Sequence, residues 1–321
     1  MTIALALLVG ALLAGWVAPA LLSVLLRARV HPQVSLTTWL TLVTGIVLAS
    51  SIALIIALLP GHGPAPQVIM VLHSCLTAIR HGGVPGAEHL AGVLWLALVV
   101  FGAARLAVRL LRYRRHQGQL YVRHRGALDW LAKHDDGPIP TLWLPHEQPM
   151  AYSIGGPEAL IIATDGLVER LPYDSVQAVL EHERAHVRGH HHLLVAVARA
   201  LAATLPWLPL ARCSPEFVGA VAELAADSSA ARMHGTRAVR TALLSMTTPH
   251  DTPPAALAMA HTCVDLRLAH LDEAGTASGR DVKQFHVALS GLCAVTLPFA
   301  LGTALFVTAA LAVCPFIPGM S

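Results

Sequence analysis

The sequence contains the motif histidine–glutamate–x–x–histidine at His182, Glu183 and His186. Histidines four residues apart lie on one face of a helix, where both imidazoles can bind one zinc ion. The intervening glutamate borders the open coordination position and can take a proton from water as that water attacks a peptide carbonyl. The motif therefore predicts a zinc peptidase with Glu183 as the general base. The alternative is a solvated helix face, because so short a motif also arises by chance among 19 histidines.

The first candidate for a third zinc ligand is His192. Residues 182–192 fit the longer metzincin pattern HExxHxxGxxH, in which Gly189 makes a turn and the last histidine completes the site. That arrangement requires the helix to end near Gly189. Residues 193–203 are strong helix formers, however, and one glycine inside a long helix costs only about 1 kcal/mol relative to alanine. We therefore predict that the helix continues through Gly189, which disfavours His192 as a ligand.

The second candidate is Glu223, in a segment with its own helix signals. Ser214 can cap the start of this helix, Pro215 suits its first position, and Gly235 suits the position just past its end. Glu223 and Asp227 are four residues apart and share one face. Glu223 can then bind the zinc ion while Asp227 accepts a hydrogen bond that orients a ligand histidine. The structural alternative is two carboxylates on a solvated helix face.

Short strands are predicted before the motif helix. Between residues 141 and 171, apolar or alternating runs are separated by glycine, proline and aspartate, which is typical of strands and hairpins. After Pro172 the pattern becomes helical. An extended peptide can add to an exposed sheet edge, which would place its scissile carbonyl beside the zinc ion. We assign Ala151 to Ile154 to that edge, with an ordinary core strand as the alternative.

The composition is that of a membrane protein. Apolar residues make up 55% of the 321 residues and charged residues only 13%, and the mean hydropathy is +0.60. This hydropathy excludes intrinsic disorder, and the formal net charge of +3 is too small for direct nucleic-acid binding. Four apolar runs are long enough to cross roughly 30 Å of hydrocarbon. They are residues 3–26, 36–59, 90–111 and 285–314.

Arginines in the connections predict the orientation of these spans. The first connection contains Arg27 and Arg29, the second contains only Arg80, and several arginines follow the third span. Basic residues favour the cytoplasmic side, so we expect external N- and C-termini and a cytosolic catalytic domain at the plasma membrane. The first run lacks a basic n-region and is too long for a secretory signal, so we interpret it as an anchor.

The predicted fold class is an α-helical membrane protein with four transmembrane helices, three plus one, and a cytosolic α+β zinc-metallopeptidase insert. The predicted domains are an N-terminal membrane domain (1–111), the metallopeptidase domain (112–284) and the fourth helix with a short external tail (285–321). Residues 193–210 are not counted as a span, because a crossing there would separate Glu223 from His186. We predict that they form a buried or membrane-abutting continuation of the motif helix.

Taken together, the sequence resembles the BlaR/MecR-type integral-membrane zinc metallopeptidases. The resemblance covers most of the chain and includes the three-plus-one spans and the cytosolic insert. Its motifs are residues 151–157, residues 164–167, the HExxH motif and the Glu223/Asp227 pair. It implies Zn²⁺ held by His182, His186 and Glu223, with Glu183 catalytic and Asp227 in support. Residues 190–192 are then polar or interfacial positions on the continuing helix.

The resemblance also implies partners. Members of the family cleave a transcriptional repressor, so we expect a protein or peptide substrate, such as a BlaI-type repressor, cut in the cytosol or next to the bilayer. A homo-oligomer is compatible with this architecture. The sensor members carry a penicillin-binding domain after the last span, whereas this sequence stops within a few residues of it, so we do not expect direct β-lactam sensing.

Three alternatives to that function stay open. Within the enzymes, the chain could be a general protease for membrane-protein quality control. In a different class, it could be a signalling scaffold whose zinc site is structural. The weakest alternative is a soluble metzincin that uses His192 as its third ligand.

Overall fold

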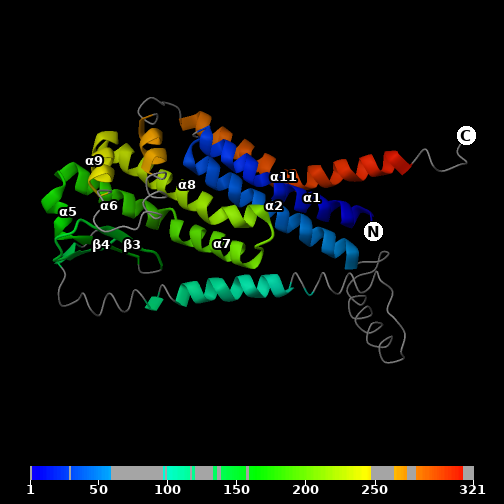
Figure 1. The fold of residues 1–321 in the computed structure, drawn as a ribbon, viewed down its shortest axis with the longest axis horizontal. Coiled ribbons are helices and arrows are strands. Elements are labelled where there is room, and N and C mark those ends of the chain that lie inside the picture. Colours follow the sequence, from blue (N-terminus) through cyan, green and yellow to red (C-terminus); the bar gives the residue numbers. More distant parts are fainter. Residues whose placement is uncertain are drawn as a thin grey trace, which may run out of the picture.

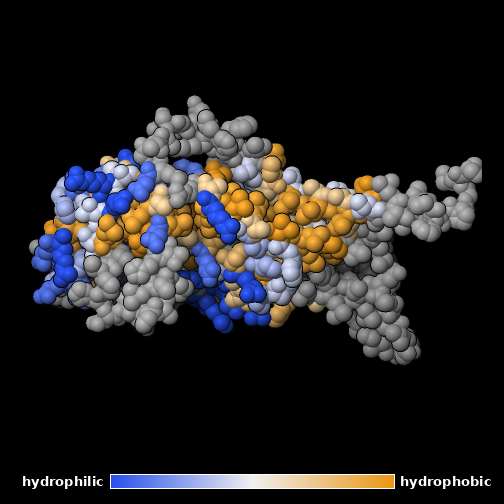
Figure 2. Space-filling model, turned by 45° about the horizontal axis from the view of Figure 1, so that its top comes forward, coloured by the Kyte–Doolittle hydropathy of each residue, from blue (hydrophilic) through white to orange (hydrophobic). Residues whose placement is uncertain are grey.

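Long apolar helices form one end of the molecule (Figure 1). The computed structural model describes residues 2–28, 30–58, 97, 100–115, 118–119, 133–135, 139–156, 159–246, 264–272 and 280–313. Three long helices, α1 (Thr2–Arg27), α2 (Pro32–Leu58) and α11 (Arg280–Val313), pack against one another. Figure 2 shows apolar surface gathered over these helices and hydrophilic surface at the opposite end of the molecule. The distribution fits helices that contact lipid at one end and a domain that contacts water at the other.

Glycines let these helices approach closely. A Cβ atom on Gly10 of α1 would lie 2.5 Å from the Gly302 backbone nitrogen of α11, and one on Gly45 of α2 would lie 2.5 Å from the Val295 carbonyl oxygen. Small residues at such crossings bring helix backbones into van der Waals contact, which is the main source of helix association in lipid. These glycines thus let α11 pack against α1 and α2, although about 220 residues separate the end of α2 from the start of α11.

Two of the described helices are long and apolar enough to cross a membrane, over Ala6–Arg27 and Pro32–Ile56. They coincide with the first two predicted spans. The predicted span 90–111 lies largely outside the described residues, which include helix from 100 to 115. The predicted span 285–314 coincides with α11, whose described apolar stretch, Ser290–Leu305, is shorter than a full crossing.

A small mixed sheet lies at the hydrophilic end. Its strands are β1 (Lys133–Asp135), β2 (Thr141–Leu144), β3 (Ala151–Ile154) and β4 (Leu160–Thr164), in the order β1-β2-β4-β3. β3 pairs antiparallel with β4, with Ser153 opposite Ile161, and β4 pairs parallel with β2. β3 is therefore an edge strand of the sheet, as predicted for residues 151–154.

The remaining helices follow the sheet. They are α5 (Asp165–Arg170), α6 (Tyr173–Arg188), α7 (His191–Thr204), α8 (Pro209–His234), α9 (Thr236–Met246) and a helix over residues 264–272. A buried cluster that includes Ile161 of β4, Leu167 of α5 and Val176 of α6 joins the sheet to the motif helix. Burial of these side chains fixes α6 relative to the edge strand.

The motif helix does not continue through Gly189, so that prediction was wrong. α6 ends at Arg188, and α7 begins at His191 after a turn in which His190 has φ 49°. A Cβ atom on Gly189 would lie 2.4 Å from His191 Nε2, so glycine leaves the room that this turn needs. Histidine is one of the residues enriched in the left-handed region. The packing of His191 against His186 outweighs the tendency of the helix formers in residues 193–203 to continue the motif helix through Gly189.

The α7–α8 hairpin packs along the apolar helices. Leu208, at its tip, contacts Gly15 of α1, and the buried Trp39 Nε1 of α2 donates a 2.8 Å hydrogen bond to Ser214 Oγ of α8. Residues of α1, α2, α7, α8 and α11 share one buried core. Residues 193–210 thus abut the apolar helices as predicted, but as a separate hairpin. The two helices that carry the candidate site residues are joined rigidly to the apolar bundle through α8.

α8 begins earlier than predicted. The predicted cap Ser214 and first-turn Pro215 lie inside a helix that starts at Pro209. The Ser214 hydroxyl is fully buried and donates a hydrogen bond to the Leu210 carbonyl oxygen, so it takes part in the helix interior. The predicted end is confirmed, because Gly235 follows the last helical residue with φ 83°.

Candidate metal centre

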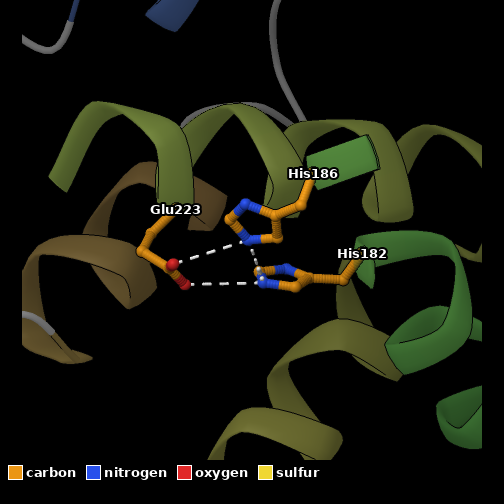
Figure 3. A group of neighbouring side chains, drawn as sticks. All are labelled: His182, His186 and Glu223. Atoms are coloured by element: carbon orange, nitrogen blue, oxygen red, sulfur yellow. Dashed lines mark hydrogen bonds and ion pairs between the residues drawn. The ribbon is translucent and has the colours of Figure 1, made fainter. Parts of the chain in front are cut away.

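Three side chains from two helices converge at the centre of the molecule. His182 and His186 come from α6 and Glu223 comes from α8 (Figure 3). The two Nε2 atoms are 3.1 Å apart, and each lies 3.4 Å from one oxygen of the Glu223 carboxylate. Donors at about 2.0–2.1 Å from a tetrahedral zinc ion lie about 3.3 Å from one another. The spacing of these three donors therefore fits a single zinc ion.

The outer nitrogen of His182 is held by Asp227. His182 Nδ1 lies 2.9 Å from Asp227 Oδ1, and the Asp227 side chain is completely buried. An ionised carboxylate accepts the Nδ1 proton, so that in the neutral imidazole the Nε2 lone pair is directed at the centre. Glu223 and Asp227, on one face of α8 as predicted, thus approach the same imidazole from opposite edges.

Arg267, which the sequence analysis did not single out, holds both carboxylates. Its Nε and Nη2 atoms donate to Asp227 at 2.6 and 2.7 Å, and its Nη1 lies 3.2 Å from Glu223 Oε2. Burial alone would raise the pKa of Asp227, but these hydrogen bonds and that of His182 lower the pKa to about 2. Arg267 lies on the helix over residues 264–272, and no spacing rule links that helix to the motif.

His191 supports the second motif histidine. Its Nδ1 lies 3.1 Å from His186 Nδ1, and the two rings meet edge to face. A donor and acceptor pair at these two atoms leaves His186 Nε2 free to face Glu223 and His182. The sequence analysis placed residues 190–192 on a continuing helix with no part in the site. The turn at Gly189 and His190 instead returns His191 to the centre.

Glu183 is placed by the edge strand. Ser153 Oγ of β3 donates a 2.7 Å hydrogen bond to Glu183 Oε2. Ser153 Oγ also lies 3.1 Å from His192 Nε2. Burial raises the pKa of Glu183, against the opposing effects of His182 and Ser153. A carboxylate whose pKa is shifted toward neutrality is a stronger base when ionised. His192 thus contacts Ser153, while Glu223 completes the group of side chains among the described residues that could hold a metal ion.

The two motif imidazoles differ in charge when no metal is bound. Burial disfavours the charged form of His182, but hydrogen bonds with Asp227 and Glu223 outweigh it and raise its pKa to about 9. Burial and the neighbouring charge lower the pKa of His186 to about 3. The pKa of Glu223, which burial alone would raise, falls to about 2 through its contact with His182. One proton therefore occupies the centre at neutral pH.

These groups line an open cleft of about 600 Å³. One wall is the edge strand, with Tyr152 and Ser153, and another is α7 together with the helix over residues 100–115. Tyr113 Oη of that helix donates a 3.0 Å hydrogen bond to the His192 carbonyl oxygen. The cleft thus brings the edge strand and the candidate metal ligands into one cavity.

The centre lies level with one end of α1. At 1.5 Å per residue, Arg27 is roughly 18 Å from Gly15 along α1, and Glu223 is roughly 22 Å from Leu208 along α8. Leu208 contacts Gly15, and farther along α8 Val221 and Leu224 border the same small pocket as Leu25 and Leu26. Glu223 is thus placed near the Arg27 end of the apolar bundle.

The part of the chain that holds the HExxH motif has known relatives. Residues 135–213 match the model of peptidase family M48. The match contains His182, Glu183 and His186 and ends ten residues before Glu223. It supports the broader expectation of a metallopeptidase-type domain, and it covers β2, β3, β4, α5, α6 and α7.

The same region is similar to proteins named Protease HtpX homolog. The protein from Aquifex aeolicus (strain VF5) is 35% identical over 81 residues, which is 24% of this chain and 27% of that protein. The protein from Limosilactobacillus reuteri (strain DSM 20016) is 35% identical over 74 residues, 22% of this chain and 25% of that protein. The protein from Sulfurovum sp. (strain NBC37-1) is 28% identical over 98 residues, 30% of this chain and 34% of that protein.

The chain thus spans about a quarter to a third of the length of these relatives. No solved structure matches it significantly. The similarity concerns the peptidase-like segment rather than the whole protein.

Proposed function

We propose that this protein is a membrane-anchored zinc endopeptidase. In this proposal His182, His186 and Glu223 hold Zn²⁺, Glu183 is the general base, and Asp227 orients His182. The observation that carries it is the convergence of three donor atoms, at the spacing of a zinc site, beside the half-buried carboxylate of Glu183, which is held at the sheet edge. The similarity of residues 135–213 to peptidase family M48 supports the same chemistry.

In this proposal, different residues of the chain carry out different steps of peptide-bond hydrolysis. Zinc, when bound, polarises the scissile carbonyl and makes water easier to deprotonate. Glu183 takes the proton from the attacking water and passes it to the leaving amine, and Ser153 holds its carboxylate in place through Oε2. The edge of β3 supplies main-chain hydrogen bonds to an extended substrate.

We further propose the membrane topology expected from the sequence. It has four spans in a three-plus-one arrangement, with domains 1–111, 112–284 and 285–321, a cytosolic catalytic domain and external termini at the plasma membrane. The contacts of α8 with α1 and α2 support a catalytic centre at the membrane surface. Arg27, at the end of α1 near Glu223, supports the cytosolic placement because basic residues favour that side.

The narrower proposal concerns the substrate. A centre at the membrane surface suits a cytosolic or membrane-proximal protein segment in extended form. The resemblance to BlaR/MecR-type peptidases suggests a BlaI-type transcriptional repressor, and two of the motifs that carry it form β3 and the junction of β4 with α5. Co-expression with a repressor encoded next to this protein, followed by immunoblotting for fragments, tests this substrate.

The enzyme itself is tested with the Glu183→Gln variant. The full chain, purified in detergent, is assayed for zinc content and for cleavage of an unstructured protein. We expect the variant to keep one zinc ion per chain and to lose turnover by roughly 10²- to 10⁴-fold, because only proton transfer is removed. A variant that cleaves as well as the wild type contradicts the peptidase proposal.

A further inference from the structure

Three arginines face the candidate centre across the cleft. Arg109 and Arg112 come from the helix over residues 100–115, and Arg199 comes from α7. Arg109 and Arg112 are three residues apart and so share a helix face, while Arg199 lies two turns beyond His192 on the face of α7 that borders the cleft. These side chains belong to segments far apart in the sequence, yet they line the same cavity as Glu183 and Glu223.

None of the three arginines is neutralised by the part of the chain that the structure describes. All three are exposed, and no described carboxylate forms an ion pair with them. The other arginine near the centre behaves differently, because Arg267 is bound to Asp227 and Glu223. Of the two carboxylates that line the cleft, Glu223 is engaged with the motif histidines and Arg267, and Glu183 with Ser153. The charges of Arg109, Arg112 and Arg199 can therefore pair with a ligand.

The helix over residues 100–115 is fixed where it borders the cleft. Tyr113 Oη bonds to the backbone of His192, the residue whose imidazole contacts Ser153. This contact holds Tyr113, which follows Arg112 in the helix, against a residue that contacts the edge strand β3. Arg105, one turn before Arg109, instead packs over the Phe101 ring and does not border the cleft. Arg109 and Arg112, which do border it, lie within four residues before Tyr113.

We propose that Arg109, Arg112 and Arg199 form a subsite for acidic side chains of the substrate. This inference rests on the proposed peptidase function and names the class of peptide that the centre takes. Residues of a peptide extended along β3 follow each other at about 3.3 Å, so side chains on one side of the scissile bond enter the arginine-lined part of the cleft. Arginine pairs with carboxylates through two parallel hydrogen bonds, and a concentrated positive wall also attracts anionic segments.

The test measures peptide binding separately from cleavage. The full-length Glu183→Gln protein, in neutral detergent, is titrated into fluorescein-labelled peptides that share one uncharged core. The peptides carry a pair of glutamates, glutamines or lysines on either side of that core, and anisotropy reports affinity. We expect the glutamate peptide to bind at least about tenfold more tightly than the glutamine peptide at low salt, in one of the two placements, with the ratio falling as salt is added.

Substitution of the three arginines tests whether they cause this preference. The combined variant Arg109→Gln, Arg112→Gln and Arg199→Gln should bring the glutamate-to-glutamine ratio close to one. The matched control is Arg170→Gln, which removes an exposed arginine of α5 outside the cleft and should leave the ratio unchanged. Circular dichroism and the zinc content of each variant show whether the fold is kept. Equal binding of all peptides, or a preference that survives the combined variant, overturns the subsite.

Lipid phosphates are the competing anion at a membrane surface. The same titration in nanodiscs of neutral or anionic phospholipid separates the two sources. A glutamate preference that persists in anionic nanodiscs supports the subsite, and one that disappears there assigns the arginines to headgroups and overturns it. These measurements also distinguish failure of the subsite from failure of the peptidase.

If the wild type cleaves every peptide equally, the peptidase proposal stands and the subsite proposal fails. If binding depends on the arginines but no peptide is cleaved, the subsite proposal stands and the peptidase proposal fails.

Discussion

Ser153 Oγ donates a 2.7 Å hydrogen bond to Glu183 Oε2, so a residue of the sheet edge holds the carboxylate that lies between the two motif histidines. The two residues are 30 positions apart in the sequence. The bond links the strand along which a substrate would lie to the group that would move the proton. Any shift of the strand relative to α6 therefore changes the position of the base.

The substitution Ser153→Ala should shift the acidic limb of the kcat/KM profile to higher pH. The serine hydroxyl stabilises the ionised carboxylate, so its loss raises the pKa of Glu183 further. Zinc content should not change, because Ser153 contacts no metal-ligating atom. Ser153→Thr, which keeps the hydroxyl, is the control. An unchanged acidic limb would show that the bond does not act on the base.

The substitution Asp227→Asn should weaken zinc binding by about 10- to 100-fold, as loss of a partner that orients a ligand histidine does. It should also lower the free energy of unfolding by about 3–5 kcal/mol, because it removes the charge of the fully buried carboxylate that pairs with Arg267 and leaves Arg267 with Glu223 alone among the described carboxylates. The matched control is Asp272→Asn, which breaks the exposed pair with Arg240. That change should cost less than about 1 kcal/mol. Equal effects of the two substitutions in chemical denaturation would contradict the structural assignment.

Zinc binding should release about one proton at neutral pH. The pKa of His182 in the metal-free protein is about 9, so below that pH the imidazole carries a proton that zinc must displace, whereas His186 is already neutral. Affinity should therefore fall about tenfold for each unit that the pH is lowered between roughly 8 and 6. Calorimetry in buffers of different ionisation enthalpy measures the released proton. An affinity that is constant above pH 6.5 would indicate an ordinary histidine.

Local patterns predicted the elements but not all of their junctions. The edge strand, α6 and the shared face of Glu223 and Asp227 follow from alternation, from the helical period and from spacing, which are properties of neighbouring residues. The break at Gly189 and His190 depends on His191 packing against His186 in three dimensions. The start of α8 at Pro209 likewise depends on its packing against α1 and α2, which stabilises helix ahead of the predicted cap.

Two contributors to the site could not be found by spacing at all. Arg267 is 40 residues beyond Asp227, on a helix whose sequence carries no motif, and only the fold brings it to the carboxylates. Ser153 is part of the predicted edge strand, but its hydrogen bond to Glu183 requires the register of β3 against β4 and the packing of α6 against β3. Long-range pairing decides both contacts.

Zinc retention should separate the two candidates for the third ligand. Glu223→Ala removes the carboxylate whose two oxygens lie 3.4 Å from the two Nε2 atoms, one oxygen from each, so we expect the purified variant to lose most of its zinc. His192→Ala should keep its zinc, because His192 Nε2 contacts Ser153 Oγ rather than the donor cluster. The helix does end near Gly189, as the metzincin pattern requires, so the position of the helix end alone cannot decide the matter. Elemental analysis of both variants, with His234→Ala as a histidine control outside the cleft, decides it. Loss of zinc from His192→Ala with retention in Glu223→Ala would establish the metzincin arrangement instead.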